Sequence, residues 1–285
     1  MRILILGAAG MLGSAIFRLL SKDEGNHIYG SIRTLQAPKW FLDDEKKNLI
    51  TGVDVENYET LIHAFMLSKP DIVINCIGLV KQLAEAENPL IAIPLNALLP
   101  HRLAVLCGIY NARLVHISTD CVFSGSRGMY IEDDISDAQD LYGRSKYLGE
   151  VDYPHAITLR TSIIGRELGG TKHGLVEWFL GQSNAVTGYT RAIFSGLPTV
   201  EMAKVIRDYV IPNPGLHGIY HVSSDPISKF DLLTLIATVY GRKIKIAPDE
   251  QVCIDRSLVS KRFRDATGYQ PSNWTELLNE MHKFN

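Results

Sequence analysis

The chain has 285 residues, 46% of them hydrophobic and 21% charged, which is typical of a globular protein with a sizeable core. Lys and Arg number 29 against 31 Asp and Glu, so the formal net charge is -2 and no long basic run supports nucleic-acid or membrane-surface binding. The N-terminal apolar run is too short for a signal peptide, and we find no run that would span a bilayer, so a cytoplasmic protein is expected.

Short apolar runs alternate with helical patterns through the first half of the chain. Strands are expected at residues 2–6, 27–32, 71–75, 114–118 and 156–164. Helices are expected at residues 11–20, 58–68, 141–150 and within 89–110. This alternation predicts an α/β fold with a Rossmann-type doubly wound parallel sheet, in which ligands bind beyond the carboxyl ends of the strands.

The pattern loosens after residue 165. Helices are expected at residues 174–180, 199–210, 230–240 and 275–284, and one further strand at 218–223. We therefore predict a dinucleotide-binding domain over residues 1–165. Residues 166–285 are expected to form a smaller substrate-binding lobe that partly interleaves with the main sheet.

Three glycines, Gly7, Gly10 and Gly13, stand directly after the first strand and before the first helix. Glycine allows a sharp turn there, a close approach of the backbone to a pyrophosphate, and tight packing of helix on strand. The free amides of the first helical turn, around Met11 and Leu12, favour phosphate binding. The segment predicts a dinucleotide site; the alternative is a plain glycine-rich turn.

The end of the second strand bears on which dinucleotide is bound. An NAD site usually carries an acid there for the ribose 2′-hydroxyl, and residues 27–34 contain none. Ser31 and Arg33 suit a 2′-phosphate instead, so NADP(H) is preferred and NAD(H) stays open, unless Arg33 is a solvated surface cation. Asp54, beside Val55, is expected either to touch the adenine or to cap the following helix.

A second set of polar residues follows a later strand. Ser118-Thr119-Asp120 comes directly after the strand, and Tyr142 and Lys146 lie four apart on one helix face. A lysine ammonium favours the phenolate, which would lower the tyrosine pKa, while the Thr119 hydroxyl can hold a substrate carbonyl. Alone, Tyr-x-x-x-Lys is more often a surface pair. The joint pattern favours hydride transfer to a ketone with a proton from Tyr142.

Four segments together carry a family resemblance. They are the glycine turn and residues 74–78 (Ile-Asn-Cys-Ile-Gly), 118–125 (Ser-Thr-Asp-Cys-Val-Phe-Ser-Gly) and 141–150 (Leu-Tyr-Gly-Arg-Ser-Lys-Tyr-Leu-Gly-Glu). In this order they resemble the extended short-chain dehydrogenases/reductases, and among these the dTDP-4-dehydrorhamnose reductases and related sugar-nucleotide reductases. The resemblance spans residues 1–165, with echoes at 198–201 and 255–258.

The resemblance implies that Thr119, Tyr142 and Lys146 form a catalytic triad. It implies cofactor contacts at Gly7, Gly10, Met11, Leu12, Gly13, Ser31, Arg33, Asp54, Val55, Cys76, Ile77, Gly78, Asn96, Ser118, Tyr142 and Lys146. It implies substrate contacts at Thr119, Asp120, Cys121 and Arg256. Alternatively, Asn96 is a satisfied polar helix residue and Arg256 belongs to a surface ion pair.

Two segments depart from the family pattern. Cys121 stands where many rhamnose-pathway reductases have an aromatic residue, and the loop at 79–82 differs from the usual one. These departures bear on which sugar is bound more than on the reaction. Cys121 has no evident histidine partner, so we interpret it as a small packing residue.

The residues and the resemblance together favour an NADPH-dependent reductase of a 4-keto nucleotide-activated deoxysugar. An NAD-dependent sugar-nucleotide epimerase is a second possible enzyme. A dehydratase is disfavoured, because the dehydratases of this group carry Asp-Glu after the Ser/Thr and Cys121 stands here in place of the Glu. A non-catalytic NADP-binding subunit resembling the methionine adenosyltransferase beta subunit is a third candidate. Histidine spacing predicts no metal site, the acidic stretch at 132–140 is expected to be a solvated loop, and a homodimer is compatible with the family.

Overall fold

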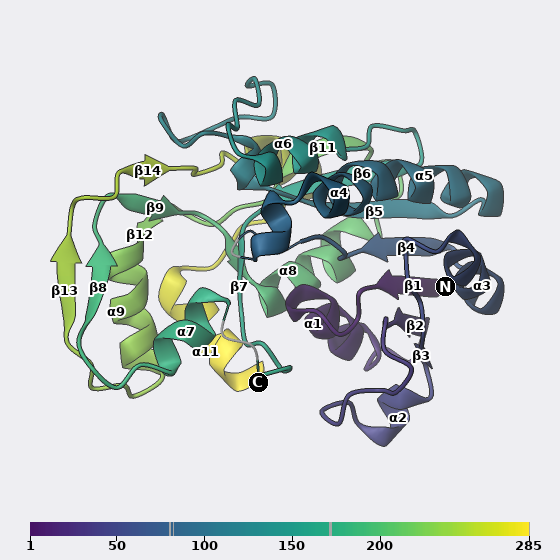
Figure 1. Cartoon of the computed structure of the whole chain (residues 1–285), viewed down its shortest axis with the longest axis horizontal. Coiled ribbons are helices and arrows are strands. Elements are labelled where there is room, and N and C mark those ends of the chain that lie inside the picture. Colours follow the sequence, from purple (N-terminus) through teal and green to yellow (C-terminus); the bar gives the residue numbers. More distant parts are fainter. Residues whose placement is uncertain (80, 82, 171–172, 285) are drawn as a thin grey trace.

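A seven-stranded parallel sheet forms the centre of the computed structural model, which describes residues 1–79, 81, 83–170 and 173–284 (Figure 1). The strand order is β11-β6-β5-β4-β1-β2-β3. The strands are β1 (Arg2–Leu6), β2 (His27–Ser31), β3 (Leu49–Ile50), β4 (Ile72–Asn75), β5 (Arg113–Thr119), β6 (Ala156–Thr161) and β11 (Gly218–His221). The order reverses beside β1, which is the doubly wound arrangement predicted from the sequence.

Helices cover both faces of this sheet, as the side chains of β1 show. Ile3 and Ile5 pack in one core cluster with α1 (Met11–Leu20) and α8 (Thr199–Val205). Leu4 and Leu6 pack in the other with α3 (Tyr58–Ser68) and α5 (Leu99–Tyr110). Successive residues of a strand point to opposite faces, so a strand buried on both faces reads as one continuous apolar run.

Two helical turns in the described part of the chain have the wide π geometry. Residues Ile93–Leu98 link α4 (Pro89–Ala92) to α5, and residues Ile206–Val210 extend α8. Single π turns inside helices often accompany functional sites. The first of these turns carries Asn96, one of the predicted cofactor residues.

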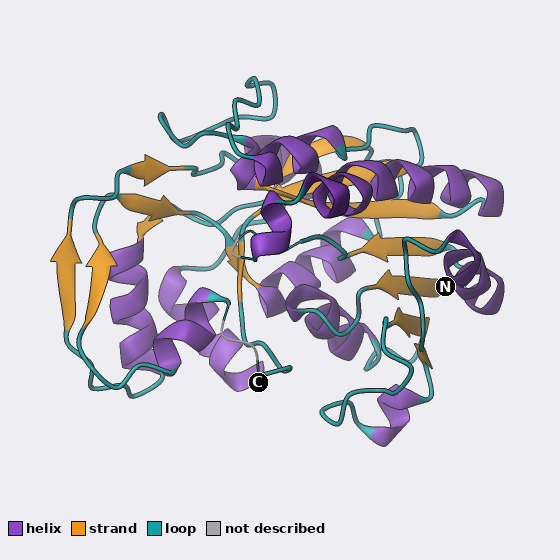
Figure 2. Cartoon of the chain, viewed as in Figure 1, coloured by secondary structure: helices purple, strands orange, loops and turns teal. Residues whose placement is uncertain are grey.

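The second half of the chain contributes to the main sheet and also builds a separate layer of short elements. β11 pairs with β6 in the central sheet, and α8 packs against α1. Most of the remaining elements lie at the end of the molecule away from β3 (Figures 1 and 2), whereas the helix at Lys261–Thr267 packs against β11. The remaining elements are β7 (Ile163–Ile164), α7 (Leu175–Leu180), β8 (Val186–Tyr189), β9 (Ala192–Phe194), β10 (Leu197–Pro198), β12 (Ile227–Ser228), α9 (Lys229–Val239), β13 (Ile246–Asp249), β14 (Ile254–Asp255), α10 (Lys261–Thr267) and α11 (Trp274–Phe284).

One helical run, Pro89–Tyr110, is long and apolar enough to cross a membrane by length and composition. This corrects the expectation that no run qualifies. Half of the run's apolar window is buried inside the protein, with Leu103 and Cys107 against the central sheet. A core helix can be as apolar as a membrane-spanning one, since one of its faces must be apolar to pack on the sheet.

Candidate active site

The glycine turn joins β1 to α1 in a compact reversal. Gly7 has φ +82°, and a Cβ placed on Gly13 would lie 2.1 Å from the Gly7 carbonyl oxygen. No side chain caps the start of α1 at Gly10, so the first amides of the helix are left for a ligand. The turn thus has the space and the donors that a pyrophosphate requires, and its residues fit a dinucleotide.

The end of β2 lies beside the turn, and its two candidate residues, Ser31 and Arg33, differ in their surroundings. Ser31 is 2% exposed, and its hydroxyl accepts a hydrogen bond from the Gly7 amide at 3.4 Å. Ser31 therefore braces the turn from within. Arg33 is exposed and makes no hydrogen bond or ion pair within the described part of the chain. Its guanidinium is thus available to an anion.

Asp54 lies on the surface between β3 and α3. Its carboxylate accepts a hydrogen bond from the Glu56 amide at 3.1 Å. Asn57 caps α3 instead, accepting from the Glu59 amide at 3.0 Å. The reading of Asp54 as the helix cap is therefore wrong, while the adenine contact stays a prediction. Val55 is buried in the core, so only its backbone could face a ligand.

The loop after β4 runs beside Lys146. Cys76 and Ile77 are half-buried and Gly78 is exposed; a Cβ placed on Gly78 would lie 3.6 Å from the Lys146 ammonium nitrogen. Burial raises the pKa of the Cys76 thiol to about 12, so the thiol is neutral at physiological pH. Segment 76–78 therefore forms a wall of the region around the lysine.

Asn96 ties this loop to the helix that carries the catalytic candidates. It is fully buried, and its Oδ1 accepts from the Leu79 amide at 3.1 Å. Its Nδ2 donates to the Ser145 hydroxyl on α6 (Leu141–Leu148), also at 3.1 Å. The side-chain amide is thus engaged on both sides, which supports the reading of Asn96 as a satisfied polar residue.

Thr119 and Tyr142 meet at the carboxyl end of β5. The Thr119 side chain lies close enough to Tyr142 to favour its phenolate. The Thr119 hydroxyl donates to the Asp120 carboxylate at 3.2 Å and accepts from the Cys121 amide at 3.1 Å. The start of α6 packs so closely on the segment after β5 that a Cβ on Gly143 would lie 2.2 Å from the Cys121 carbonyl oxygen. Glycine at position 143 permits this approach. Asp140 caps α6, accepting from the Gly143 amide at 2.7 Å, and so fixes the turn that holds Tyr142.

Lys146 is 4% exposed and donates to the Ile117 carbonyl at 2.8 Å. Burial lowers its pKa to about 8, with Glu150 and Cys76 acting in the opposite direction. The expected lowering of the Tyr142 pKa is not found. Burial, with Cys121 next in size, raises the pKa of Tyr142 above its usual value, so the half-buried phenol holds its proton at neutral pH.

Ser118 does not face the cofactor region with its hydroxyl. That hydroxyl donates to the Glu150 carboxylate at 2.7 Å, and Glu150 in turn pairs with Arg160. Neither Glu150 nor Arg160 was among the predicted site residues. A buried charge is hard to recognise from sequence, because the pair is separated by ten residues and shares no periodic pattern.

The substrate candidates converge on Asp120. This carboxylate is 9% exposed; burial raises its pKa, while Arg256 and Lys81 favour its charged form. Arg256 comes from the distant β14 segment, and its Nε donates to the Phe123 carbonyl at 2.7 Å. No ion pair of Arg256 occurs among the described residues. Cys121 is half-buried, and burial raises its thiol pKa to about 12, which suits a packing role.

Lys81 is a site residue that the sequence reading missed. Its ammonium pairs with Asp140 at 2.7 Å and lies 5.9 Å from the centre of the Tyr142 ring. It belongs to the loop at 79–82 that departs from the family pattern; Val80 and Gln82 of that loop lie outside the described residues. The departure of this loop from the family pattern was the available signal.

The acidic stretch before α6 is not simply solvated, which corrects the expectation for 132–140. The Glu132 side chain is 4% exposed and accepts from the His221 amide at 2.9 Å. Asp137 accepts from the Ser124 amide and hydroxyl at 2.7 and 2.6 Å. These contacts hold the loop against the sheet. Over the residues described, no group of three or more His, Cys, Asp or Glu is arranged to hold a metal.

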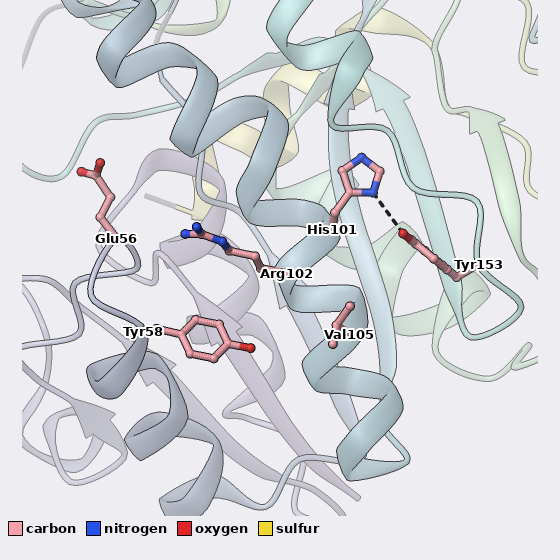
Figure 3. A pocket seen from close by; sticks show the side chains of 6 residues that line it. All are labelled: Glu56, Tyr58, His101, Arg102, Val105 and Tyr153. Carbon is pink, nitrogen blue, oxygen red and sulfur yellow. Dashed lines mark hydrogen bonds between the residues drawn. The ribbon is translucent and has the colours of Figure 1, made fainter.

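A separate hollow lies on the α5 surface (Figure 3). The side chains that line it are Glu56, Tyr58, His101, Arg102, Val105 and Tyr153. Figure 3 shows the ring of His101 turned toward the Tyr153 hydroxyl, 3.2 Å away. None of the predicted catalytic, cofactor or substrate residues lines this hollow.

The sequence and the fold of the chain are similar to those of known proteins. Residues 1–283 match the model of the RmlD substrate binding domain. The chain is 28% identical over 77% of its length to a probable low-salt glycan biosynthesis reductase, Agl14, of Haloferax volcanii, 73% of which is covered. It is 26% identical over 84% of its length to methionine adenosyltransferase 2 subunit beta of Xenopus tropicalis, 72% of which is covered.

The solved structures include a dTDP-4-dehydrorhamnose reductase from Bacillus anthracis in complex with NADP. It superposes with a TM-score of 0.80 and 22% identity, covering 100% of this chain and 98% of that one. At this identity the likeness establishes the fold. With a family model that matches nearly the whole length, the chain belongs to the RmlD substrate-binding domain family.

Proposed function

We propose that the protein is an NADPH-dependent reductase of a 4-keto nucleotide-activated deoxysugar. The observation that carries the proposal is that the Thr119 and Tyr142 side chains lie together at the end of β5, with Lys146 buried on the helix that carries Tyr142. Two of the relatives above are named as reductases, one of them complexed with NADP. A cytoplasmic location and a homodimer stay predictions.

The cofactor is assigned to the glycine turn and its surroundings. The uncapped start of α1 would hold the pyrophosphate, and Asp54 would lie at the adenine. Arg33, exposed and free of protein partners in the described residues, would pair with a 2′-phosphate. A reduced nicotinamide, when bound, supplies the hydride.

The catalytic residues divide the remaining work. The Thr119 hydroxyl holds the substrate carbonyl and shares the negative charge that develops on its oxygen. Tyr142, which keeps its proton because its pKa is raised, donates that proton to the same oxygen. The Lys146 ammonium, charged below a pH of about 8, stabilises the phenolate left behind.

The substrate side is assigned to the Asp120 region. Within the described residues, Arg256 hydrogen-bonds through its Nε, to the Phe123 carbonyl. Its other nitrogens are available to a phosphate of a nucleotide sugar. Asp120 and Cys121, directly after the catalytic threonine, would contact the sugar.

A regulatory subunit is the second candidate, because the chain is similar to methionine adenosyltransferase 2 subunit beta over most of its length. A panel of 4-keto sugar nucleotides incubated with NADPH decides between the two. Turnover supports the reductase, whereas NADPH binding without turnover of any panel member favours the regulatory role. NAD that stays bound through purification would favour an epimerase.

The test of mechanism is Tyr142→Phe, with Tyr147→Phe as the matched control, because Tyr147 is exposed on the same helix. Loss of the proton donor should lower kcat by roughly 10²–10⁴-fold with NADPH affinity unchanged. The control should keep wild-type kcat. An active Tyr142→Phe enzyme would overturn the assignment of the proton donor.

A further inference from the structure

A fully buried ion pair lies directly behind the catalytic residues. The side chains of Glu150 and Arg160 are each 2% exposed. Arg160 donates from Nε to one carboxylate oxygen at 2.8 Å and from Nη2 to the other at 2.7 Å. Burial of two charges carries a large desolvation cost, and an apolar pair of the same volume is often as stable. Stability alone therefore does not account for this pair.

The pair joins the three segments that surround the proposed chemistry. Glu150 lies just beyond α6, four residues after Lys146. Its carboxylate accepts from Ser118, the residue before Thr119, at 2.7 Å. Arg160 stands on β6 opposite Ser118 in the register of the sheet. One carboxylate thus fixes the end of β5 and the end of α6 on the same arginine.

The outer side of Arg160 is held as firmly as its inner side. Its Nη1 lies 3.2 Å from the His221 ring on β11 and 3.4 Å from the Glu132 carbonyl. The guanidinium also lies over the Phe123 ring, 5.2 Å from its centre. Because these contacts come from three separate segments, the arginine has little freedom to move away from Glu150.

We propose that Glu150, held by Arg160, is a positioning residue of this site, which fixes Thr119 through Ser118 and places a negative charge beside the Lys146 ammonium. The predicted effect of Glu150 on kcat rests on the proposed reductase function. Its electrostatic part concerns only residues of this chain. Glu150 touches none of the proposed reacting atoms, so it acts through Ser118 and Lys146.

Among the described residues, three titratable side chains interact electrostatically with Lys146. Cys76 faces it from the loop after β4, His116 from β5, and Glu150 from its own segment. His116 is neutral at physiological pH, since burial and then Lys146 lower its pKa well below the usual value. Cys76 is neutral as well, with a pKa of about 12. Glu150 is the one of these three that forms an ion pair, with Arg160 at 2.7 Å.

The sign of the effect follows from these charges. Burial lowers the Lys146 pKa to about 8, and the Glu150 carboxylate opposes that lowering. A neutral residue at position 150 should let the Lys146 pKa fall further. Part of the lysine would then lose its proton near pH 7, where the wild-type residue is charged.

The direct test is the titration of Lys146 in the full-length, cofactor-free protein, followed by NMR of ¹³Cε-labelled lysine. The Lys146 resonance is assigned by its loss in Lys146→Met. We expect a midpoint near 8 in the wild type and one lower by roughly half a unit or more in Glu150→Gln. Glu177→Gln is the matched control, since it breaks an Arg–Glu pair remote from Lys146 and should not move the midpoint.

A second variant guards against misfolding. Glu150→Leu combined with Arg160→Met replaces the pair by apolar side chains, leaves no unpaired buried charge, and also removes the carboxylate. It should lower the Lys146 midpoint in the same direction. An unchanged midpoint in the folded variants, single or double, would overturn the proposal.

The kinetic readout separates this proposal from the proposed function. In an active enzyme, Glu150→Gln should move the alkaline limb of kcat to lower pH, and Ser118→Ala should lower kcat without moving that limb. A wild-type protein that reduces no 4-keto sugar nucleotide would refute the reductase function. The NMR titration would still decide whether Glu150 sets the charge state of Lys146.

Discussion

Replacing Gly13 by alanine should remove the dinucleotide site while leaving most of the fold in place. A Cβ on residue 13 would lie 2.1 Å from the Gly7 carbonyl oxygen, 2.8 Å from its carbon and 3.2 Å from the Ala8 Cα. All three atoms belong to the backbone, so no side chain can rotate to relieve the contact. Either α1 must move away from β1 or the turn must open.

The magnitude follows from the size of that movement. Ordinary contacts of a Cβ with an oxygen lie beyond about 3 Å, so the turn and the helix must separate by roughly 1 Å. Overpacking of this kind typically costs about 1–3 kcal/mol of folding stability. The same shift displaces the first amides of α1 from the phosphates, and NADPH affinity should fall by at least about tenfold, which corresponds to about 1.4 kcal/mol.

The assay is NADPH titration by fluorescence together with a thermal melt. Gly25→Ala is the matched control, because a Cβ at residue 25 meets nothing within 4 Å. The control should bind NADPH as the wild type does. If Gly13→Ala bound NADPH with wild-type affinity and an unchanged Tm, the turn would not be the phosphate site and the argument from its packing would fail.

Three further outcomes test other parts of the site. Arg33→Ser should weaken NADPH binding by roughly tenfold or more, the value of a charge-assisted hydrogen bond, and leave NADH binding unchanged in parallel titrations. Because burial lowers the Lys146 pKa to about 8, kcat for reduction should decline as pH rises through 8; a flat profile from 7 to 10 would contradict its role as the ammonium. Arg256→Ala should raise KM for the sugar nucleotide by about tenfold with kcat nearly constant, as steady-state kinetics at saturating NADPH would reveal.

Six of the seven strands of the main sheet could be predicted from the sequence because they form apolar runs buried on both faces, whereas the two-residue strand β3 was not expected. The expected strand at 2–6 and helix at 11–20 match β1 and α1, and the expected helix at 199–210 matches α8 with its π extension. Long apolar runs and helical spacing determine such elements locally. The short strands of the second half, such as Val186–Tyr189 and Ile246–Asp249, have no such pattern. They form because each pairs with the other across sixty residues of chain.

The candidate site was predictable to the level of segments but not of side-chain directions. Parallel strands end at one edge, so residues after β1 and β5 had to lie near one another, and Thr119 and Tyr142 do meet. The directions of Ser118 and Asn96 depend on partners that no spacing reveals. Ser118 turns to Glu150 and Asn96 to α6, so both hydrogen-bond within the protein.

The protonation of Tyr142 shows how the folded environment changes the chemical argument. The sequence suggested a lysine that lowers the tyrosine pKa, but the Lys146 ammonium bonds the Ile117 carbonyl and burial raises the pKa of the phenol. A ketone reductase needs a donor that keeps its proton until negative charge develops on the substrate oxygen. A phenol with a raised pKa meets that need at neutral pH. In the reverse reaction the phenol would have to give up its proton first and act as a base, which a raised pKa disfavours.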